Sequence, residues 1–557
     1  MNTEETNVDL QDAADETKDA EPKEATEGPA QVSADADATE ADVSEADLDQ
    51  EEQEKLPMTG GGDGAEDAVS AGGGETVEEN GSVKLKMPEE AEVEEVKFTG
   101  LNKEELLRVA GTPGWVRTRW ALLVVFWLGW LGMLGGAVLI ILQAPRCRDL
   151  PDTAWWNGGP LYQIGNIQAF TDAGDLKGVE QKMGSLSQLK VRGLLLGPIH
   201  VAPPDEAMSL RFEEISSELG NLEQFRSLVQ AAHKKGISVV LDLTPNYRGS
   251  SGPWFSNISV TNVAERLKSA LVFWMNEGVD GVQLAGVERV ASVVPSLWLD
   301  IRAIVQNGTE ERPDKRVLIG VTERSAAEEV SALLSSSGVD LLVSRVLRPG
   351  NTDAGELAQS VQLLYSSHSQ TQLAWNLGGR AEGHLASLVG PALVRLHTLL
   401  LLTLPGAPVV NYGDEIGLMD QDTKFPRMLW DSDEELNGTL QEERAERLSC
   451  RRFFRVLSEL RGKERSLLYG DFLLLSNSSS SLAFQRVWDQ SERYIAAFNW
   501  APEEAALPLS RAAALPQRAS VVLSTNASAL PADSSVDLTE LRLGPGQAAL
   551  LRFPYTG

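Results

Sequence analysis

The acidic side chains that end short apolar runs are the residues of this chain that could do acid–base chemistry. Asp242 ends the run SVVLD, and Glu323 lies two residues after Val321 at the end of another. Two carboxyl groups about 5 Å apart, one a nucleophile and one an acid and base, hydrolyse glycosidic bonds with retention. In a parallel barrel such groups stand at the C-terminal ends of strands. Whether this chain can do that chemistry therefore depends on which residues end its neighbouring strands.

Eight β-rich apolar runs alternate with amphipathic helical stretches after Pro145. They are residues 161–170, 193–199, 238–246, 279–285, 317–323, 339–345, 371–376 and 408–415. This alternation predicts an α/β fold, a (β/α)8 TIM barrel over residues 158–464. A doubly wound open sheet is the alternative, but no glycine-rich phosphate loop follows the first run. Alternating runs such as RYIAAFNW predict a small antiparallel β-sandwich domain over residues 465–557.

Four segments of the predicted barrel resemble the α-amylase family of glycoside hydrolases. They are LDLTPN (241–246), GVDGVQLA (278–285), LTLPGAPVVNYGDEIGL (402–418) and FPRMLWD (425–431). The resemblance covers roughly residues 160–557 and implies a barrel with a C-terminal β domain. The inserted domain of that family is missing, because only about fourteen residues separate Asn246 from the helical run near Thr261. One wall of the sugar cleft and any calcium site there would be missing too, and we expect no metal or cofactor.

The resemblance also implies positions for the catalytic groups, and this chain departs from the family there. The family has its nucleophile, an Asp, at the end of the fourth strand, and this chain has Ala285 at that position. The Arg that accompanies the Asp in the family is replaced here by Gln283. The family's general acid, a Glu at the end of the fifth strand, is replaced here by Val321. The His that follows the LDLTPN segment in the family is replaced by Tyr247, whereas Asp242 of this segment is retained. We therefore expect these five residues to form a vestigial site without hydrolase activity.

Three other carboxylates are the best case for activity. Glu323 shares a strand face with Val321 and could substitute as an acid. Asp280 lies an odd number of residues from Ala285 and should face away, and Glu288 lies beyond the strand. An active cell-surface α-glucosidase is therefore the alternative, but without a nucleophile orders of magnitude of rate would be lost.

One segment, residues 121–142, is apolar and free of charge. A helix of this length spans about 33 Å, slightly more than the hydrocarbon core of a bilayer. Since about 120 residues precede it, we predict a signal anchor over residues 120–143 and not a cleaved signal peptide. Gly129, Gly132 and Gly136 recur at three- and four-residue spacing and predict a packing face for a transmembrane partner.

The residues before the span have two different compositions. Residues 1–96 hold 31 acidic residues against 5 Lys and no aromatic residue, so we expect a disordered acidic tail. Docking of cytosolic proteins by this tail is possible, but no motif supports it. The acidity of the chain is confined to this tail, and no nucleic-acid partner is expected. Residues 97–119 predict a juxtamembrane amphipathic helix, with Asn102 as its cap and an end near Gly111 to Gly114.

Two independent features predict the orientation in the membrane. Five basic residues, Lys97, Lys103, Arg108, Arg117 and Arg119, precede the span, whereas Arg146 and Arg148 follow it closely. The positive-inside rule then places the N-terminus in the cytoplasm. N-glycosylation acceptors follow the span at Asn257, Asn307, Asn437, Asn477 and Asn526, and one, Asn80, precedes it. Both features predict a type II glycoprotein of the plasma membrane with an extracellular C-terminal part.

The acidic tail, the single span and Cys147 just beyond it together resemble the cell-surface heavy subunits of heteromeric amino-acid transporters. The resemblance implies that Cys147, in the neck over residues 144–157, forms a disulfide with a polytopic light chain, an L-type or related amino-acid exchanger. The heavy subunit would bring this exchanger to the plasma membrane. An adhesion or integrin-signalling receptor is the alternative, with cytosolic partners at the tail. Cys450, in a helical stretch, is expected to be a buried thiol.

Overall fold

The computed structural model describes residues 102–143, 147–307, 315–349, 353–430, 439–507, 509 and 515–555. The predicted acidic tail over residues 1–96 and the acceptors Asn80 and Asn437 lie outside the described residues.

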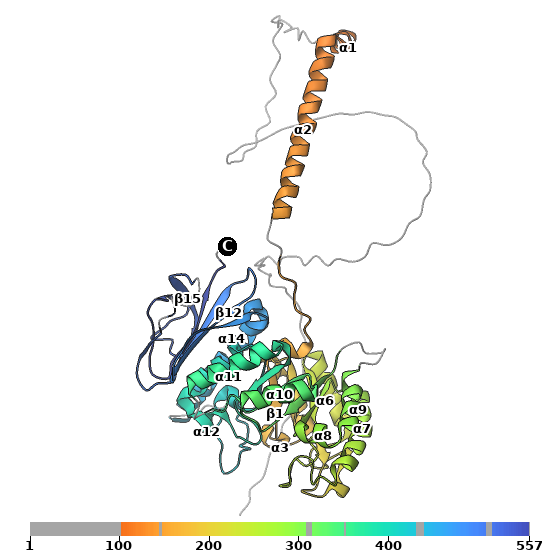
Figure 1. The fold of residues 1–557 in the computed structure, drawn as a ribbon, viewed down its shortest axis with the longest axis vertical. Coiled ribbons are helices and arrows are strands. Elements are labelled where there is room, and N and C mark those ends of the chain that lie inside the picture. The colour runs from red at the N-terminus through yellow and green to blue at the C-terminus, as the bar shows by residue number, and fades with distance from the viewer. Residues whose placement is uncertain are drawn as a thin grey trace, which may run out of the picture. The chain divides into compact units, whose positions relative to one another are not determined.

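Eight parallel strands close into a barrel in the order β1-β10-β9-β8-β7-β6-β5-β2. Figure 1 shows helices on the outside of this barrel. Their bounds are β1 Leu161–Ile164, β2 Gly193–Leu196, β5 Ser238–Asp242, β6 Gly281–Ala285, β7 Val317–Val321, β8 Leu341–Val343, β9 Leu373–Asn376 and β10 Ala407–Asn411. Each strand overlaps one of the eight apolar runs, so the predicted barrel is confirmed. Branched side chains such as Val240, Ile319 and Val409 fill the interior, while Leu194 and Val239 face the covering helices. Because both faces are buried, the strands appear in the sequence as continuous apolar runs.

Helices cover the outside of the barrel, and short turns connect them to the strands. The α-helices are α3 Ile167–Phe170, α4 Leu176–Gln181, α5 Met183–Gln188, α6 Leu222–Lys234, α7 Val260–Asn276, α8 Val287–Val293, α9 Pro295–Gln306, α10 Ala327–Ser337, α11 Ala354–Ser367, α12 Leu385–Val389, α13 Val394–Thr403, α14 Thr439–Lys463 and α15 Arg465–Leu468. The 3-10 turns are η1 Trp155–Asn157, η2 Ala207–Ser209, η3 Gln370–Gln372, η4 Pro391–Leu393 and η5 Asp414–Ile416. A small hairpin, β3 His200–Val201 with β4 Arg211–Ile215, was not predicted.

The first apolar run is shorter as a strand than its sequence suggests. Only Leu161–Ile164 is β1, because the side chain of Asn166 accepts a hydrogen bond from the N–H of Ala169 at 3.2 Å and begins α3. An N-cap of this kind satisfies a helix donor that has no partner within the helix.

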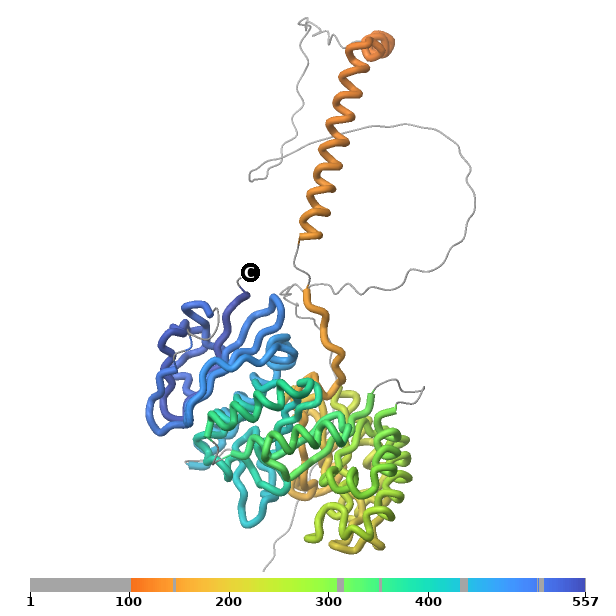
Figure 2. The backbone as a smooth tube through the Cα atoms, viewed as in Figure 1, coloured from red at the N-terminus to blue at the C-terminus, as the bar shows by residue number. Residues whose placement is uncertain are grey.

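The C-terminal part is antiparallel, as predicted. A six-stranded sheet has the order β11-β12-β13-β18-β15-β16, and β14 pairs with β17 in a separate ribbon. The bounds are β11 Asp471–Asn477, β12 Ser481–Val487, β13 Arg493–Asn499, β14 Ala505–Leu507, β15 Arg518–Ser524, β16 Ser535–Asp537, β17 Leu541–Leu543 and β18 Ala548–Phe553. Ile495 and Ala497 of the sheet pack with Leu507 and Leu541 of the ribbon in one core. The sheet also packs on α11 and α13 of the barrel. Figure 2 shows the C-terminal sheet, in blue, beside the barrel.

Two helices precede the barrel. They are α1 Lys103–Ala110 and α2 Pro113–Gln143, and within the described residues α2 alone is long and apolar enough to cross a membrane. Residues 97–101 of the predicted juxtamembrane helix lie outside the described residues. Within the rest, α1 forms one helix, and residues 113–119 form about the first two turns of α2. Gly111 ends α1, and Pro113 begins α2, where its missing N–H costs nothing. Asn102 precedes α1, but its side chain makes no capping hydrogen bond.

Candidate functional site

A cavity of about 620 Å³ lies at the C-terminal ends of the barrel strands. All five residues of the predicted vestigial site line it: Asp242, Tyr247, Gln283, Ala285 and Val321. The register explains why, since Asp242 pairs with Gln283, and Ala285 pairs with Val321, on neighbouring strands β5, β6 and β7. The carboxylates that line the cavity are Asp242, Glu323 and Glu382.

Asp242 is the buried carboxylate of this cavity. Its Oδ2 accepts a hydrogen bond from the Nε2 of Gln283 at 3.2 Å, and its Oδ1 accepts one from the N–H of Thr244 at 2.9 Å. Burial raises the pKa of Asp242, and the hydrogen bonds oppose this shift. The hydroxyl of Thr244 also accepts a hydrogen bond from the N–H of Ala285 at 3.0 Å. Amide and hydroxyl groups therefore hold the end of β6 and this carboxylate.

Arg380 brings a positive charge into the cavity. Its guanidinium lies 4.6 Å from the ring centre of Tyr247 and 6.0 Å from that of Phe425. Its Nη2 donates to the carbonyl oxygen of Tyr247 at 3.1 Å, and the Tyr247 hydroxyl donates to the carbonyl oxygen of His200, also at 3.1 Å. Burial lowers the pKa of Arg380, and the nearby Asp242 opposes this shift. Arg380 thus occupies space and supplies charge beside the carboxylate.

Glu323 and Glu288, which could have substituted for the missing general acid, are each bound to another side chain of the chain. Glu323 is an exposed side chain whose Oε2 lies 2.7 Å from Arg345 Nη2, and the Nε of Arg345 donates to Glu382 at 2.6 Å. Glu288, in the first turn of α8, accepts from the hydroxyl of Thr322 at 3.3 Å. The two carboxylates at the cavity rim therefore share one arginine.

Asp280 directly precedes β6 and so lies at the opposite end of this strand from Ala285 and the cavity. Its Oδ2 accepts a hydrogen bond from the backbone N–H of Val239 at 2.7 Å. The same oxygen lies 2.7 Å from Nε2 of His233. Among the described residues, no group of three or more His, Cys, Asp or Glu side chains is arranged to hold a metal ion.

The two cysteines have different surroundings. Cys147 is exposed in the neck, and Cys450 is buried in α14, where its Sγ lies 3.6 Å from Glu446 Oε1. Burial raises the pKa of the Cys450 thiol, so this thiol is protonated and poorly reactive near neutral pH. Cys147 is the accessible thiol of the described chain.

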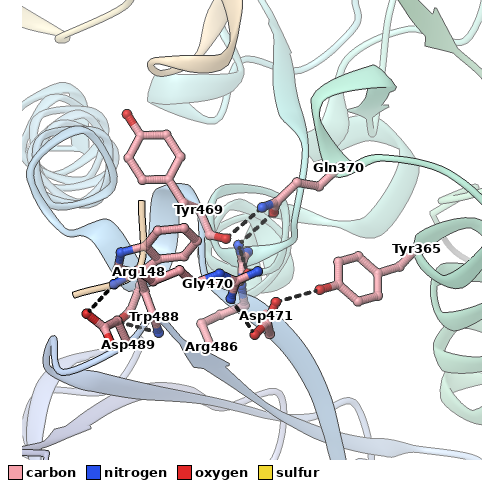
Figure 3. Close-up of polar contacts among 10 residues, drawn as sticks. Arg148, Tyr365, Gln370, Tyr469, Gly470, Asp471, Arg486, Trp488 and Asp489 are labelled. Atoms are coloured by element: carbon pink, nitrogen blue, oxygen red, sulfur yellow. Dashed lines mark hydrogen bonds and ion pairs between the residues drawn. The ribbon is translucent and has the colours of Figure 1, made fainter. Parts of the chain in front are cut away.

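Arg148, next to Cys147, is a residue whose role sequence reasoning missed. Its guanidinium lies 4.5 Å from the ring centre of Trp488, and its Nη1 lies 3.0 Å from Asp471 Oδ2 (Figure 3). Its backbone N–H donates to Asp489 Oδ2 at 3.1 Å. In the sequence Arg148 is only a positive charge after the span, and its partners lie more than three hundred residues away.

The fold and the cavity define an α-amylase-type barrel that follows a helix long and apolar enough to cross a membrane. Residues 84–162 match the family described as solute carrier family 3 member 2 N-terminus, and residues 163–262 match the alpha amylase catalytic domain. The chain is 42% identical over 522 residues to the amino acid transporter heavy chain SLC3A2 of Oryctolagus cuniculus, covering 90% of this chain and 96% of the relative. It is 23% identical to the heavy chain SLC3A1 of Rattus norvegicus, covering 84% of this chain and 88% of the relative. The chain belongs to the family of amino acid transporter heavy chains.

Solved structures that resemble this chain include an alpha-amylase and a trehalulose synthase. Alpha-amylase from Geobacillus thermoleovorans aligns with a TM-score of 0.56 at 18% identity, over 72% of this chain and 99% of that chain. Trehalulose synthase MutB from Pseudomonas mesoacidophila aligns with a TM-score of 0.57 at 16% identity, covering 72% and 100%. At this identity the likeness shows the shared fold alone.

Proposed function

We propose that this chain is the accessory subunit of a polytopic amino-acid exchanger, to which Cys147 links it by a disulfide. The chain would bring the exchanger to the plasma membrane, with its N-terminus in the cytoplasm and its barrel outside. The observation that carries this proposal is the 42% identity, over nine-tenths of the chain, to relatives named amino acid transporter heavy chains. The single span has no charged residue between 121 and 142 with which to bind or conduct a solute. Transport therefore belongs to the partner.

The accessible thiol supports a covalent link. Cys147 lies five residues after the apolar run, so it stands near the outer membrane surface in the proposed orientation, where disulfides persist. Replacing Cys147 with Ser should remove the higher-mass band of the complex on non-reducing gels, whereas Cys450→Ser should retain it. A Cys147→Ser chain that still runs at the higher mass would contradict the interchain bond.

The proposed function includes the absence of catalysis. Ala285 cannot form a glycosyl ester, Val321 cannot donate a proton, and Asp242 is bound to an amide. The rim carboxylate Glu323 is paired with Arg345. We expect no hydrolysis of α-glucosides by the purified full-length chain, and turnover that disappears on Glu323→Gln substitution would overturn this part of the proposal.

A further inference from the structure

Arg148 joins the neck to one edge of the C-terminal sheet. Its three contacts are with Asp471, the first residue of β11, and with Trp488 and Asp489, which follow β12 (Figure 3). Asp471 pairs directly with Val487 at the end of β12, so the three contacting residues are neighbours on the sheet. A backbone N–H and a side chain of one residue thus bind a single small surface, the neck clamp, formed by Asp471, Trp488 and Asp489.

The surface that receives Arg148 is itself held in place. Trp488 is buried, and its backbone N–H donates to the hydroxyl of Ser466 at 3.2 Å. The second oxygen of Asp471 accepts from the hydroxyl of Tyr365, a residue of α11 in the barrel, at 3.3 Å. The buried Arg486 donates to the carbonyl oxygens of Gly470, at 2.9 Å, and Thr403, at 2.8 Å. Arg148 therefore docks onto groups that the fold has already fixed.

The other charge pair of the neck is different. Asp152 lies 3.5 Å from Lys315, and their side chains are 92% and 67% exposed. Two exposed side chains at this separation gain little from pairing, because water screens them and ordering them costs entropy. The neck clamp, with a backbone donor and a buried aromatic face, is the better-defined attachment.

The clamp limits where Cys147 can be. Consecutive Cα atoms lie about 3.8 Å apart, and the Cα atoms of a disulfide lie no more than about 6.8 Å apart. A cysteine joined to Cys147 therefore has its Cα within about 11 Å of the Arg148 Cα. The N–H of Arg148 is bound to Asp489, in the turn between β12 and β13.

We propose that Arg148 is a positioning residue, which holds Cys147 at the β12–β13 turn, and that the light-chain segment carrying the partner cysteine docks on this turn. This inference rests on the proposed disulfide-linked function. The bond forms between the two sulfur atoms, and each thiol loses its hydrogen. The two electrons and two protons pass to a disulfide oxidant, either a protein disulfide or glutathione disulfide, which is reduced to two thiols. Arg148 takes no part in this transfer and only restricts the volume that Cys147 searches.

The first test follows the rate of linkage. Full-length Arg148→Ala is co-expressed with an L-type exchanger light chain, and the linked fraction is followed by pulse–chase on non-reducing gels. Loss of the guanidinium contacts should slow linkage about fivefold, and Arg148→Lys, which retains the charge, should recover part of the rate. Lys315→Ala is the matched control and should link at the wild-type rate. A wild-type rate for Arg148→Ala, or equal slowing by Lys315→Ala, would overturn the role of Arg148.

The second test moves the thiol onto the sheet. Gln490 is exposed in the β12–β13 turn, so Cys147→Ser with Gln490→Cys should capture the same light chain. Adding Arg148→Ala to this pair should leave linkage unchanged, because the thiol no longer depends on the neck; slowing there would indicate a general folding defect and overturn the positioning role. Met208, exposed at the far end of the barrel strands, is the control: Cys147→Ser with Met208→Cys should not link.

Each outcome separates the two proposals. If Cys147→Ser alone keeps the higher-mass band, the proposed function is wrong. If Cys147→Ser loses the band but Gln490→Cys does not restore it, or Met208→Cys restores it equally, the docking position is wrong and the interchain bond stands.

Discussion

Gln283 donates a hydrogen bond to Asp242 at 3.2 Å, so the buried carboxylate of the barrel mouth faces a neutral amide. Asp242 is buried, and this burial raises the pKa of its carboxyl group despite the hydrogen bonds that it accepts. A carboxyl whose pKa is higher in the folded chain than in the unfolded chain binds protons more tightly when folded. Its ionisation near neutral pH therefore opposes folding.

Replacing Asp242 with Asn should stabilise the barrel at pH 7. An amide retains the acceptor for Thr244, and Gln283 can rotate its own amide to complete the pair. Because burial disfavours the ionised carboxylate and an amide carries no charge, we expect the free energy of unfolding to increase. The gain should be complete above the raised folded pKa and should disappear below about pH 4, where Asp242 is protonated in both states. Thermal unfolding as a function of pH measures it.

Asp205 provides a control for Asp242, because its pKa is shifted in the opposite direction. Its carboxylate accepts hydrogen bonds from Ser250, Ser251 and Asn246, and these bonds lower its pKa. The stabilisation it provides is therefore present above the unfolded pKa and is lost as the pH falls towards the folded pKa. Asp205→Asn should destabilise the chain at pH 7, with a smaller effect in acid. Equal pH profiles for the two variants would contradict the opposite environments assigned to these carboxylates.

The barrel could be predicted because its strands are buried on both faces. The side chains of Leu194, Leu195 and Leu196 in β2 are all buried, so the run is apolar without interruption. The β3–β4 hairpin gives no such signal, since β4 has the sequence RFEEI and only its Phe212 is buried. The break between α1 and α2 was also placed imprecisely, because both Gly111 and Gly114 could end a helix and only Gly111 does.

The candidate site was predicted in part, for a similar reason. Positions at strand ends follow from the two-residue period, and Ala285 and Val321 accordingly line one cavity. Arg380 and Arg148 lie in segments without periodicity, and their contacts join residues far apart in the chain. No local pattern in the sequence indicates that Arg380 lines the cavity or that Arg148 contacts Trp488.

Arg461 should be essential for stability although none of the described residues gives it a carboxylate partner. Its guanidinium is buried and donates to the carbonyl oxygens of Leu402 at 2.6 Å and Leu404 at 2.9 Å, and also to that of Gly406. These carbonyls lie at and just after the C-terminal end of α13, where helical partners are lacking. Arg461→Met should lower the free energy of unfolding by about 3 kcal/mol.

Urea unfolding followed by tryptophan fluorescence measures this loss. Arg455→Met is the matched control, because Arg455 lies on the same helix α14 and is exposed. It should change the free energy of unfolding by less than about 0.5 kcal/mol. If both substitutions have the same effect, the carbonyl contacts of Arg461 do not stabilise the fold as argued.

The glycosylation acceptors test the orientation of the chain. Asn257, Asn307, Asn477 and Asn526 are exposed, so each can accept a glycan without rearrangement of the fold. The Oδ1 of Asn257 accepts from Arg289, at 2.7 Å from its Nη2, and this leaves the Nδ2 that a glycan would use. Replacing each of these residues with Gln should remove one step of the mass shift that glycosidase treatment produces. Asn80→Gln should remove none, because we place it in the cytoplasm; a shift at Asn80 would reverse the proposed orientation.

The glycines of the span should affect assembly without affecting the barrel. Apart from the neighbouring backbone of the helix, a Cβ atom added at Gly129, Gly132 or Gly136 would meet no atom of the described residues within 4 Å, so the isolated helix tolerates larger side chains there. At 100° per residue these three lie on one face, and small residues there let a second helix approach closely. Replacing all three with Leu should reduce recovery of the exchanger with the Cys147→Ser chain, in which no disulfide can hold the two together. Leu134→Phe, on the opposite face, is the control and should leave recovery unchanged. If the triple substitution also leaves recovery unchanged, the partner helix does not pack on the glycine face.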